Sequence, residues 1–220
     1  MKLAHWTTNI AGAMLTLAVT TASAELINDV TFNGVGANGV YVTGKGGTGP
    51  ESGSAVQSYA NDNNLFGATT SSWSFLVKDK DKNNSVSADY SGFHFTLAAD
   101  DKDKKSGTWT LTVTDLNPDS GLSIPFEMDF LAYMHGGNNG AFYFFDDREI
   151  SASNAGTFQI TFKNNSGNFP GLSNFDLLVR DLRDISTQPP AEVDIPEPAS
   201  MLLFGAGLLG LGLSRRRKLA

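Results

Sequence analysis

The sequence predicts an all-β protein, an antiparallel β-sandwich of jelly-roll type, with one helix at each end of the chain. The first observation is alternation with a period of two. In residues 108–114, Trp109, Leu111 and Val113 fall on one side of an extended chain and four threonines on the other. The second is composition, because 18% charged residues and 23 glycines among 220 suit strands and turns better than helices.

The same alternation recurs along the body, and each run ends in turn-forming residues. Strands are predicted around Trp73/Phe75/Val77, Phe93/Phe95/Leu97, Phe126/Met128/Phe130, residues 157–163 and Phe175/Leu177/Val179. Turns are predicted at 79–85, 100–107, 117–121, 136–140 and 164–168. Residues 34–54 read as a long loop around a short strand at 40–42, and no stretch of the body shows helical periodicity. Short strands with one apolar face require two packed sheets, with a barrel as the alternative.

The N-terminal 24 residues have the layout of a signal peptide. Lys2 supplies positive charge, residues 10–19 form a short apolar run, and Ala22 and Ala24 give the small-x-small pattern that signal peptidase needs. We expect a signal helix over residues 1–24, with cleavage before Glu25. The β-sandwich domain is then expected over 25–185 and a linker over 186–194.

The C-terminal residues 195–218 contain three features in a fixed order. Pro196, Glu197 and Pro198 come first, the uncharged run 199–213 follows, and the basic residues Arg215, Arg216, Arg217 and Lys218 close the segment. Fifteen helical residues span roughly 22 Å, which can insert into a bilayer by local thinning. The sequence therefore predicts a single transmembrane helix with its basic end in the cytoplasm and the body outside.

This order of features resembles the PEP-CTERM sorting signal of exopolysaccharide-producing Gram-negative bacteria. The resemblance covers about the last 25 residues and rests on Pro196-Glu197-Pro198, the Gly/Leu-rich run and the basic cluster. It implies recognition and cleavage by exosortase, a membrane-embedded protease-transpeptidase. The helix would then be a transient inner-membrane anchor, and the body would pass to the cell surface or to the extracellular matrix of a biofilm. A permanent tail anchor is the alternative.

The charge balance constrains the partners of the exported body. Five of the 16 basic residues and one of the 23 acidic residues lie outside residues 25–194, so this body has a net charge of −11. We therefore expect no nucleic-acid partner. The absence of cysteine excludes disulfides and thiolate metal sites.

One strand brings two carboxylates to the same face. Glu127 and Asp129 flank Met128, and a pair so placed can act as acid and nucleophile on a sugar. The stretch resembles the Glu-x-Asp strand of jelly-roll endoglucanases, but the further Glu of that pattern is missing here, where Leu131 and Ala132 follow. A solvated strand face is the favoured interpretation. Tyr143 is a weak candidate for stacking on a sugar.

Residues 79–85 space oxygen side chains as a calcium loop does, through Asp79, Asp81 and Asn83. Asn84 replaces the usual glycine and Tyr90 the bidentate glutamate, so a polar hairpin turn is favoured and calcium stays a weak possibility. No motif of a known hydrolase or cofactor enzyme is present. We expect a non-catalytic surface or exopolysaccharide-matrix protein without a cofactor; the alternative is a secreted glycan-active enzyme or lectin-like module built on Glu127 and Asp129.

Overall fold

We describe the protein from a computed structural model, over residues 26–43, 49–51, 53–67, 71–80, 85–100, 103–119 and 121–185. The chain divides into a body that ends at Asp184 and a second unit, 185–220. The predicted signal peptide, linker and sorting tail, with all their named residues, lie outside the described residues. Within the described residues, no helix has the length and apolar character needed to cross a membrane.

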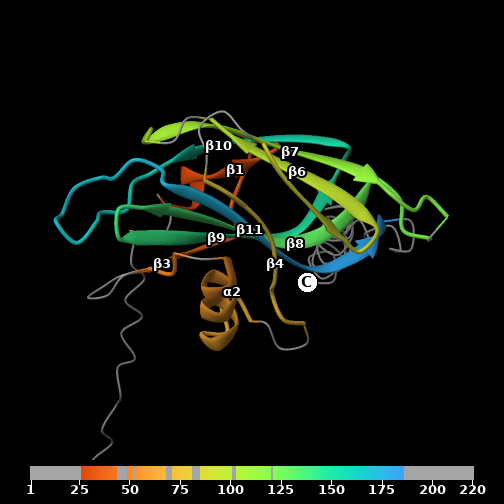
Figure 1. Cartoon of the computed structure of the whole chain (residues 1–220), viewed down its shortest axis with the longest axis horizontal. Helices are drawn as coiled ribbons and strands as arrows, with labels where there is room; N and C mark the ends of the chain where they lie inside the picture. Colours follow the sequence, from red (N-terminus) through yellow and green to blue (C-terminus); the bar gives the residue numbers. More distant parts are fainter. Residues whose placement is uncertain are drawn as a thin grey trace, which may run out of the picture. The chain divides into compact units, whose positions relative to one another are not determined.

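One of the two main sheets has four antiparallel strands in the order β10-β7-β6-β5. They are β5 (Val86–Tyr90), β6 (Phe93–Ala99), β7 (Ser106–Asp115) and β10 (Ser153–Gln159). The sheet forms the upper layer in Figure 1. Its strands alternate strictly, as in β10, where every second residue is buried. The predicted all-antiparallel β architecture is confirmed.

The second main sheet has five antiparallel strands in the order β3-β9-β8-β11-β4. They are β3 (Gly39–Val42), β4 (Ser74–Asp79), β8 (Phe126–Gly136), β9 (Asn139–Ile150) and β11 (Asn174–Asp184). A short 3₁₀ turn, η1 (Ile27–Asp29), precedes a two-stranded sheet of β1 (Thr31–Phe32) and β2 (Val35–Gly36). The three central strands of the five-stranded sheet are the longest of the described body, and both of their faces are largely buried.

The two sheets pack face to face around an aromatic core. The largest fully buried side chains of this core include Trp109, Phe130 and Phe145, and the rings of Phe130 and Phe145 are stacked 4.5 Å apart. Phenylalanine side chains therefore fill the space between the sheets, as the alternation predicts. Burying one such side chain contributes roughly 1.5–3 kcal/mol, so this core is the main source of stability.

The strand predicted at 157–163 is displaced in the structure, where β10 covers Ser153–Gln159. Its first half is made of small residues, which give no apolar alternation. The glycine at position 156 is required by packing. A Cβ there would lie 2.3 Å from Trp109 Nε1 and 2.1 Å from the Thr31 carbonyl oxygen. Close packing of Trp109 against β10 therefore requires a residue without a side chain.

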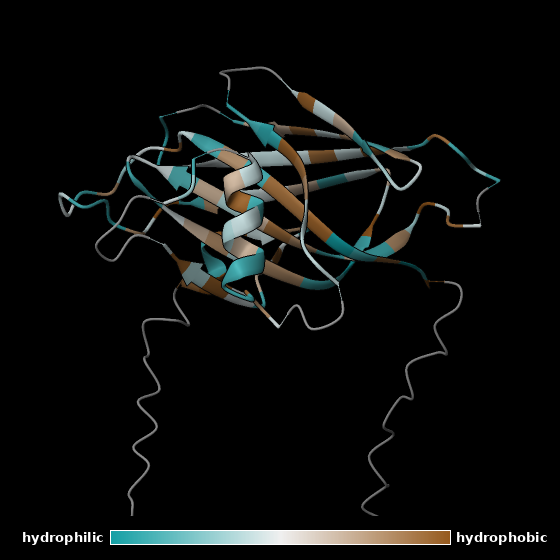
Figure 2. Cartoon of the chain, turned by 60° about the horizontal axis from the view of Figure 1, so that its bottom comes forward, coloured by the Kyte–Doolittle hydropathy of each residue, from teal (hydrophilic) through white to brown (hydrophobic). Residues whose placement is uncertain are grey.

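A helix covers the outer face of the five-stranded sheet, contrary to the expectation that the body has none. Helix α2 (Gly53–Asp62) begins at the end of the stretch that was predicted as a loop. Val56 and Ala60 are fully buried, one helical turn apart, and pack with Trp73, Leu131 and Phe142 in a second apolar cluster. Figure 2 shows the helix lying across the strands. Helix α2 could not be predicted from the sequence, because Val56 and Ala60 alone form too narrow an apolar stripe among its serine and amide side chains.

Candidate functional site

The two predicted carboxylates lie at one end of the outer face of the five-stranded sheet. Phe126, Met128 and Phe130 of β8 point into the core, so Glu127 and Asp129 share the opposite face, as predicted. On the neighbouring strand β11, Arg180 is the register partner of Asp129 and Arg183 that of Glu127. We call these four residues together with Asp147 the acid–arginine cluster.

Asp129 is the buried centre of the acid–arginine cluster, with 5% of its surface exposed. Its Oδ1 accepts the backbone N–H of Asp147 at 2.9 Å, and its Oδ2 accepts Arg180 Nε at 3.0 Å. Burial raises the pKa of Asp129, and these two donors partly offset that increase by stabilising the charged form. The two donors therefore fix the orientation of the Asp129 carboxylate and stabilise its ionised form.

Arg180 joins the acid–arginine cluster to the apolar cluster under α2. Its guanidinium lies 4.0 Å from the centre of the Trp73 ring and 5.5 Å from that of Phe144, while Nη2 donates to the Phe66 carbonyl at 3.1 Å. A cation over an aromatic face is stabilised by the ring quadrupole, more so when both are removed from water. Its Nε also lies 3.5 Å from Asp181 Oδ2, so Arg180 has two carboxylates, a carbonyl and two rings as partners.

Glu127 and Arg183 form the outer, more exposed part of the cluster. Arg183 Nε donates to Glu127 Oε2 at 3.0 Å, and its Nη2 contacts an oxygen of Asp147. The hydrogen bond to Asp147 is the main cause that raises the pKa of Arg183. With 38% of the Arg183 side chain exposed, water screens these pairs more than it screens Arg180 and Asp129.

Two β-bulges bring these side chains together. The β8–β11 register shifts between Arg180 and Arg183, and the β8–β9 register shifts between Met128 and Phe130. Asp181 and Asp147 adopt positive φ angles of 53° and 49° at these irregularities. An extra residue lets Arg180 and Arg183, three positions apart, reach the same face. A strict period of two would separate them, so their pairing with the acids could not be predicted.

The chemistry open to this cluster is limited by its cations. Carboxylate oxygens of Asp129, Asp146 and Asp147 lie within 4.8 Å of one another, a spacing that suits a metal ion. Arg180 and Arg183 already bind Asp129 and Asp147, and a guanidinium in that place repels a cation. A general acid must also hold a proton, whereas each arginine favours the ionised form of its partner.

The remaining predicted site residues lie elsewhere. Tyr143 is fully buried in the core between the sheets, so the expected exposure of its ring is wrong; Phe142 takes the outer face instead because β9 alternates. Asp79 is 5% exposed and accepts the Ala99 N–H at 3.0 Å. It therefore helps to join β4 to the end of β6. Asp81 and Asn83, the other calcium candidates, lie outside the described residues.

A second candidate surface is the outer face of the four-stranded sheet. In-register partners align Ser87, Thr96, Thr112 and Ser153 in one hydroxyl row that crosses all four strands, and Ser87 Oγ lies 2.8 Å from Thr96 Oγ1. We call this surface the hydroxyl face. Its further outward positions are Asp89, His94, Ala98, Ser106, Thr108, Thr110, Thr114, Ala155, Thr157 and Gln159.

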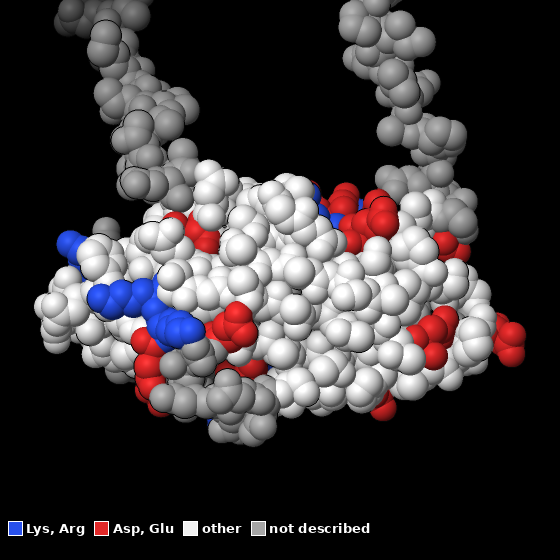
Figure 3. All heavy atoms as spheres, turned by 90° about the horizontal axis from the view of Figure 1, so that it is seen from above, with Lys and Arg blue, Asp and Glu red and all other residues white. Residues whose placement is uncertain are grey.

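The hydroxyl face is almost free of charge, although the body as a whole is acidic. Asp89 is the one Asp, Glu, Lys or Arg at those outward strand positions, and it contacts His94 Nδ1 at 2.5 Å. Directly after β6, the exposed carboxylate of Asp100 accepts a hydrogen bond from the Thr108 hydroxyl at the end of this face. Figure 3, which looks onto this side, shows acidic and basic side chains mainly around the margin of a wide uncharged area. This surface offers hydroxyl donors, hydroxyl acceptors and methyl groups at regular strand spacing.

Comparison with known proteins identifies the C-terminal segment. Residues 194–218 match the family described as the PEP-CTERM protein-sorting motif, which confirms the resemblance of this tail. A motif of this class implies an exported protein that exosortase processes at the cell envelope. No curated protein and no solved structure matches the chain.

Proposed function

We propose that this protein is an exported, non-catalytic component of the cell surface or of the exopolysaccharide matrix, released from a transient inner-membrane anchor by exosortase. The observation that carries the proposal is the sorting motif at 194–218. Export through the predicted signal peptide, with cleavage by signal peptidase after Ala24, precedes this step. The destination is the outside of a Gram-negative cell.

The acid–arginine cluster supports a non-catalytic role for the body. Glu127 and Asp129, the residues on which a glycan-active enzyme would depend, each receive an arginine at 3.0 Å. Asp129 is also buried and hydrogen-bonded to a backbone amide. These contacts are typical of a structural ion-pair network, and they favour the surface protein over the enzyme or lectin-like alternative at the same residues.

The hydroxyl face supports a neutral polysaccharide as the partner of the body. A polyanionic chain would be repelled by a body of net charge −11. The row through Thr96 and Thr112 instead presents uncharged donors and acceptors across the whole sheet. Repeated hydroxyls of a neutral sugar polymer can pair with such a row, and bridging waters can complete the contact.

The sorting step is tested by the intact mass of the protein recovered from the cell surface and the medium of its native host. We expect loss of residues 1–24 and of the segment after the Pro196–Pro198 region. Deletion of the exosortase gene should leave the uncut chain in the inner membrane. A full-length C-terminus in cells that possess exosortase would contradict the proposal and indicate a permanent anchor.

Contact with the matrix is tested by co-sedimentation of the purified body with insoluble neutral polysaccharide from the host. Thr112→Glu places a charge at the centre of the hydroxyl face and should reduce the bound fraction at least tenfold. Ser58→Glu adds the same charge on the exposed side of α2, and we expect it to bind as the wild type does. Equal binding of both variants would rule out the hydroxyl face as the contact surface.

A further inference from the structure

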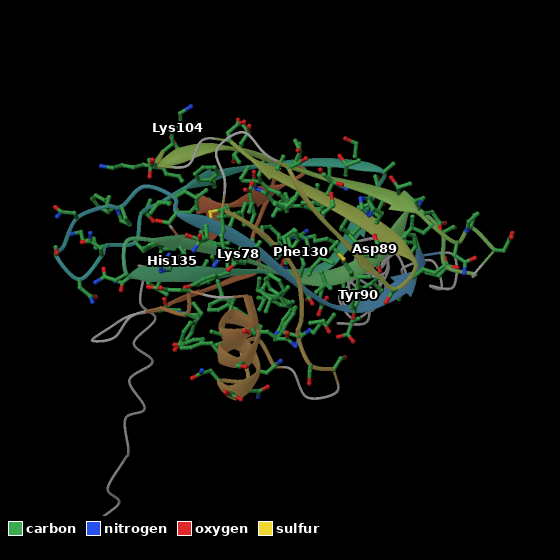
Figure 4. All side chains as sticks on the ribbon, in the orientation of Figure 1. Lys78, Asp89, Tyr90, Lys104, Phe130 and His135 are labelled. Atoms are coloured by element: carbon green, nitrogen blue, oxygen red, sulfur yellow. The ribbon has the colours of Figure 1, made fainter. Side chains whose placement is uncertain are left out.

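A second polar group lies at the other end of the outer face of the five-stranded sheet. Lys78 of β4 and Asp176 of β11 are register partners, and Asn174 is on the same face of β11, two residues before Asp176. His135 of β8 faces Asn174 in the register of the neighbouring pair. Figure 4 labels Lys78 and His135 on this sheet. These side chains belong to neither surface discussed above.

Asp176 is buried without the partners that a buried carboxylate normally has. None of its surface is exposed, and within the described part of the chain neither carboxylate oxygen has a hydrogen-bond partner. The nearest cation is Lys78, whose Nζ lies 3.9 Å from Oδ2. Buried polar atoms are usually paired, and a carboxylate without donors is far more stable as the neutral acid.

Lys78 is partly buried, with 9% of its side chain exposed. Its Nζ donates to the Glu51 carbonyl. The Asn174 amide lies beside this amine and within 3.4 Å of His135 Nδ1. We assign the amide the orientation that satisfies both of its ends, in which the oxygen accepts from Lys78 Nζ at 3.3 Å and the nitrogen donates to the Ser173 carbonyl at 2.9 Å. Burial lowers the pKa of Lys78 and raises that of Asp176. Transfer of a proton from the ammonium to the carboxylate removes both buried charges and leaves a neutral amine beside an amide carbonyl.

We propose that Lys78 and Asn174 join spontaneously through an intramolecular isopeptide bond, with Asp176 as the proton donor and acceptor of the reaction. A partly buried amine, an amide in contact with it and a buried carboxyl with no hydrogen-bond partner among the described residues are the three groups that this condensation needs. All three come from two paired strands, so the fold itself brings them together.

The reaction balances without any further reagent. Lys78 Nζ, as the neutral amine, attacks Cγ of Asn174 while the Asp176 carboxyl donates a proton to the amide oxygen. Asp176 takes one proton from the attacking amine and passes it to Nδ2. The C–N bond to Nδ2 then breaks, the nitrogen leaves as ammonia with its own two protons and this third one, and the proton on the oxygen returns to Asp176. Asp176 ends as it began, and the product is a secondary amide between β4 and β11.

Such a bond would tie the last strand of the body to a strand almost one hundred residues earlier in the chain. Strand β11 leads directly to the linker and the sorting tail, so any pull on a C-terminal attachment enters the body through it. The cross-link would hold β11 in the sheet at its first residues, Asn174 and those that follow. The bond does not depend on the proposed function and forms with or without sorting.

Mass spectrometry of the purified mature chain tests the proposal. We expect an intact mass lower than the sequence mass by one ammonia, and a branched tryptic peptide that joins Lys78 to Asn174. Lys78→Arg and Asp176→Asn should each restore the sequence mass. Lys80→Arg, at the exposed position directly after β4, is the matched control and should keep the loss of ammonia.

The wild-type mass decides the question even where a variant fails to fold. An unmodified mass in freshly prepared and in aged wild-type protein would overturn the proposal. Loss of one water, with a branched peptide joining Lys78 to Asp176, would overturn the assignment to Asn174. Loss of ammonia in Asp176→Asn would show that the carboxyl takes no part in the reaction.

Discussion

The outer face of the five-stranded sheet has a buried carboxylate at each end, and the two differ in the hydrogen bonds that they accept. Asp129 receives Arg180 Nε at 3.0 Å and a backbone N–H at 2.9 Å. Asp176 receives no hydrogen bond from the described residues, and Lys78 stays 3.9 Å away. Burial raises the pKa of both, and for Asp176 it does so to about 7.

The difference teaches that donors, rather than burial, distinguish a structural acid from a reactive one. At the Asp129 end, two donors hold the carboxylate charged and fixed, which suits a network that fastens β8, β9 and β11 together. At the Asp176 end, the lack of donors leaves a proton that can be exchanged near neutral pH. The predictions below test these two ends in turn.

The largest effect is expected from Arg180→Met, which leaves Asp129 buried without a cation. Breaking one side of a buried pair costs about 3–5 kcal/mol, and the lost contacts with Trp73 and Phe66 favour the upper end. The melting temperature should fall by about 10–20 °C, as measured by circular dichroism. Arg180→Met combined with Asp129→Leu should recover most of the loss. Equal stability of the single variant and the wild type would contradict the structural role of this pair.

A smaller effect is expected from Asp176, and it depends on pH. Its folded pKa, about 7, exceeds the value of 3.8 for an unperturbed carboxyl, so the fold prefers the protonated form. The stabilisation is complete below about pH 4 and is lost as the pH rises through 7, a change of about 4 kcal/mol at 1.36 kcal/mol per pH unit. Urea unfolding of Lys78→Met, which cannot form the cross-link and places no cation beside Asp176, should show this decline.

Adding Asp176→Asn to Lys78→Met should remove the decline, because an amide does not ionise. The other titratable groups that interact with Asp176 or with residue 78, namely Lys80, Glu51, Tyr133 and His135, are the same in both proteins. Burial lowers the pKa of His135, so its own effect is a loss of stability as the pH falls, and the comparison cancels it. Parallel pH profiles of the two proteins would show that Asp176 does not titrate in this range.

The sequence predicted the parts of the fold that follow from burial on one face. Alternation of residues such as Trp109, Leu111 and Val113 arises wherever a strand covers a core, so strands and turns could be located, and Glu127 and Asp129 could be assigned to one face. The same argument gave a wrong prediction for the exposure of the Tyr143 ring. Both faces of the first half of β9 are buried, so alternation there does not distinguish the core side from the solvent side.

The parts that were missed depend on contacts distant in sequence. Val56 and Ala60 are a weak helical signal until Trp73 and Phe142 provide a surface to cover. Arg180 and Arg183 join the acids only through bulges at Asp147 and Asp181, which no local pattern reveals. Lys78 and Asn174 lie almost one hundred residues apart, and only the pairing of β4 with β11 brings them into contact.

Within the acid–arginine cluster, Arg183→Ala should have a much smaller effect than Arg180→Met. Arg183 is 38% exposed, and an exposed pair contributes about 0–1 kcal/mol. We expect a melting temperature lower by about 1–4 °C at low salt, and a difference that nearly disappears in molar sodium chloride. The Arg180→Met deficit should persist in the same salt. A salt-independent loss of similar size in both variants would mean that Arg183 is as desolvated as Arg180.

The smallest effect is expected from calcium. Arg180 and Arg183 bind the carboxylates of Asp129 and Asp147 that the ion would need, so calcium and chelator should give the same melting temperature. A rise with calcium would contradict this, and two variants would then locate the ion. Loss of the rise in Asp146→Asn would place it in the acid–arginine cluster, with Arg183 displaced. Loss in Asp81→Asn would place it in the 79–85 turn and leave the arginine network as described.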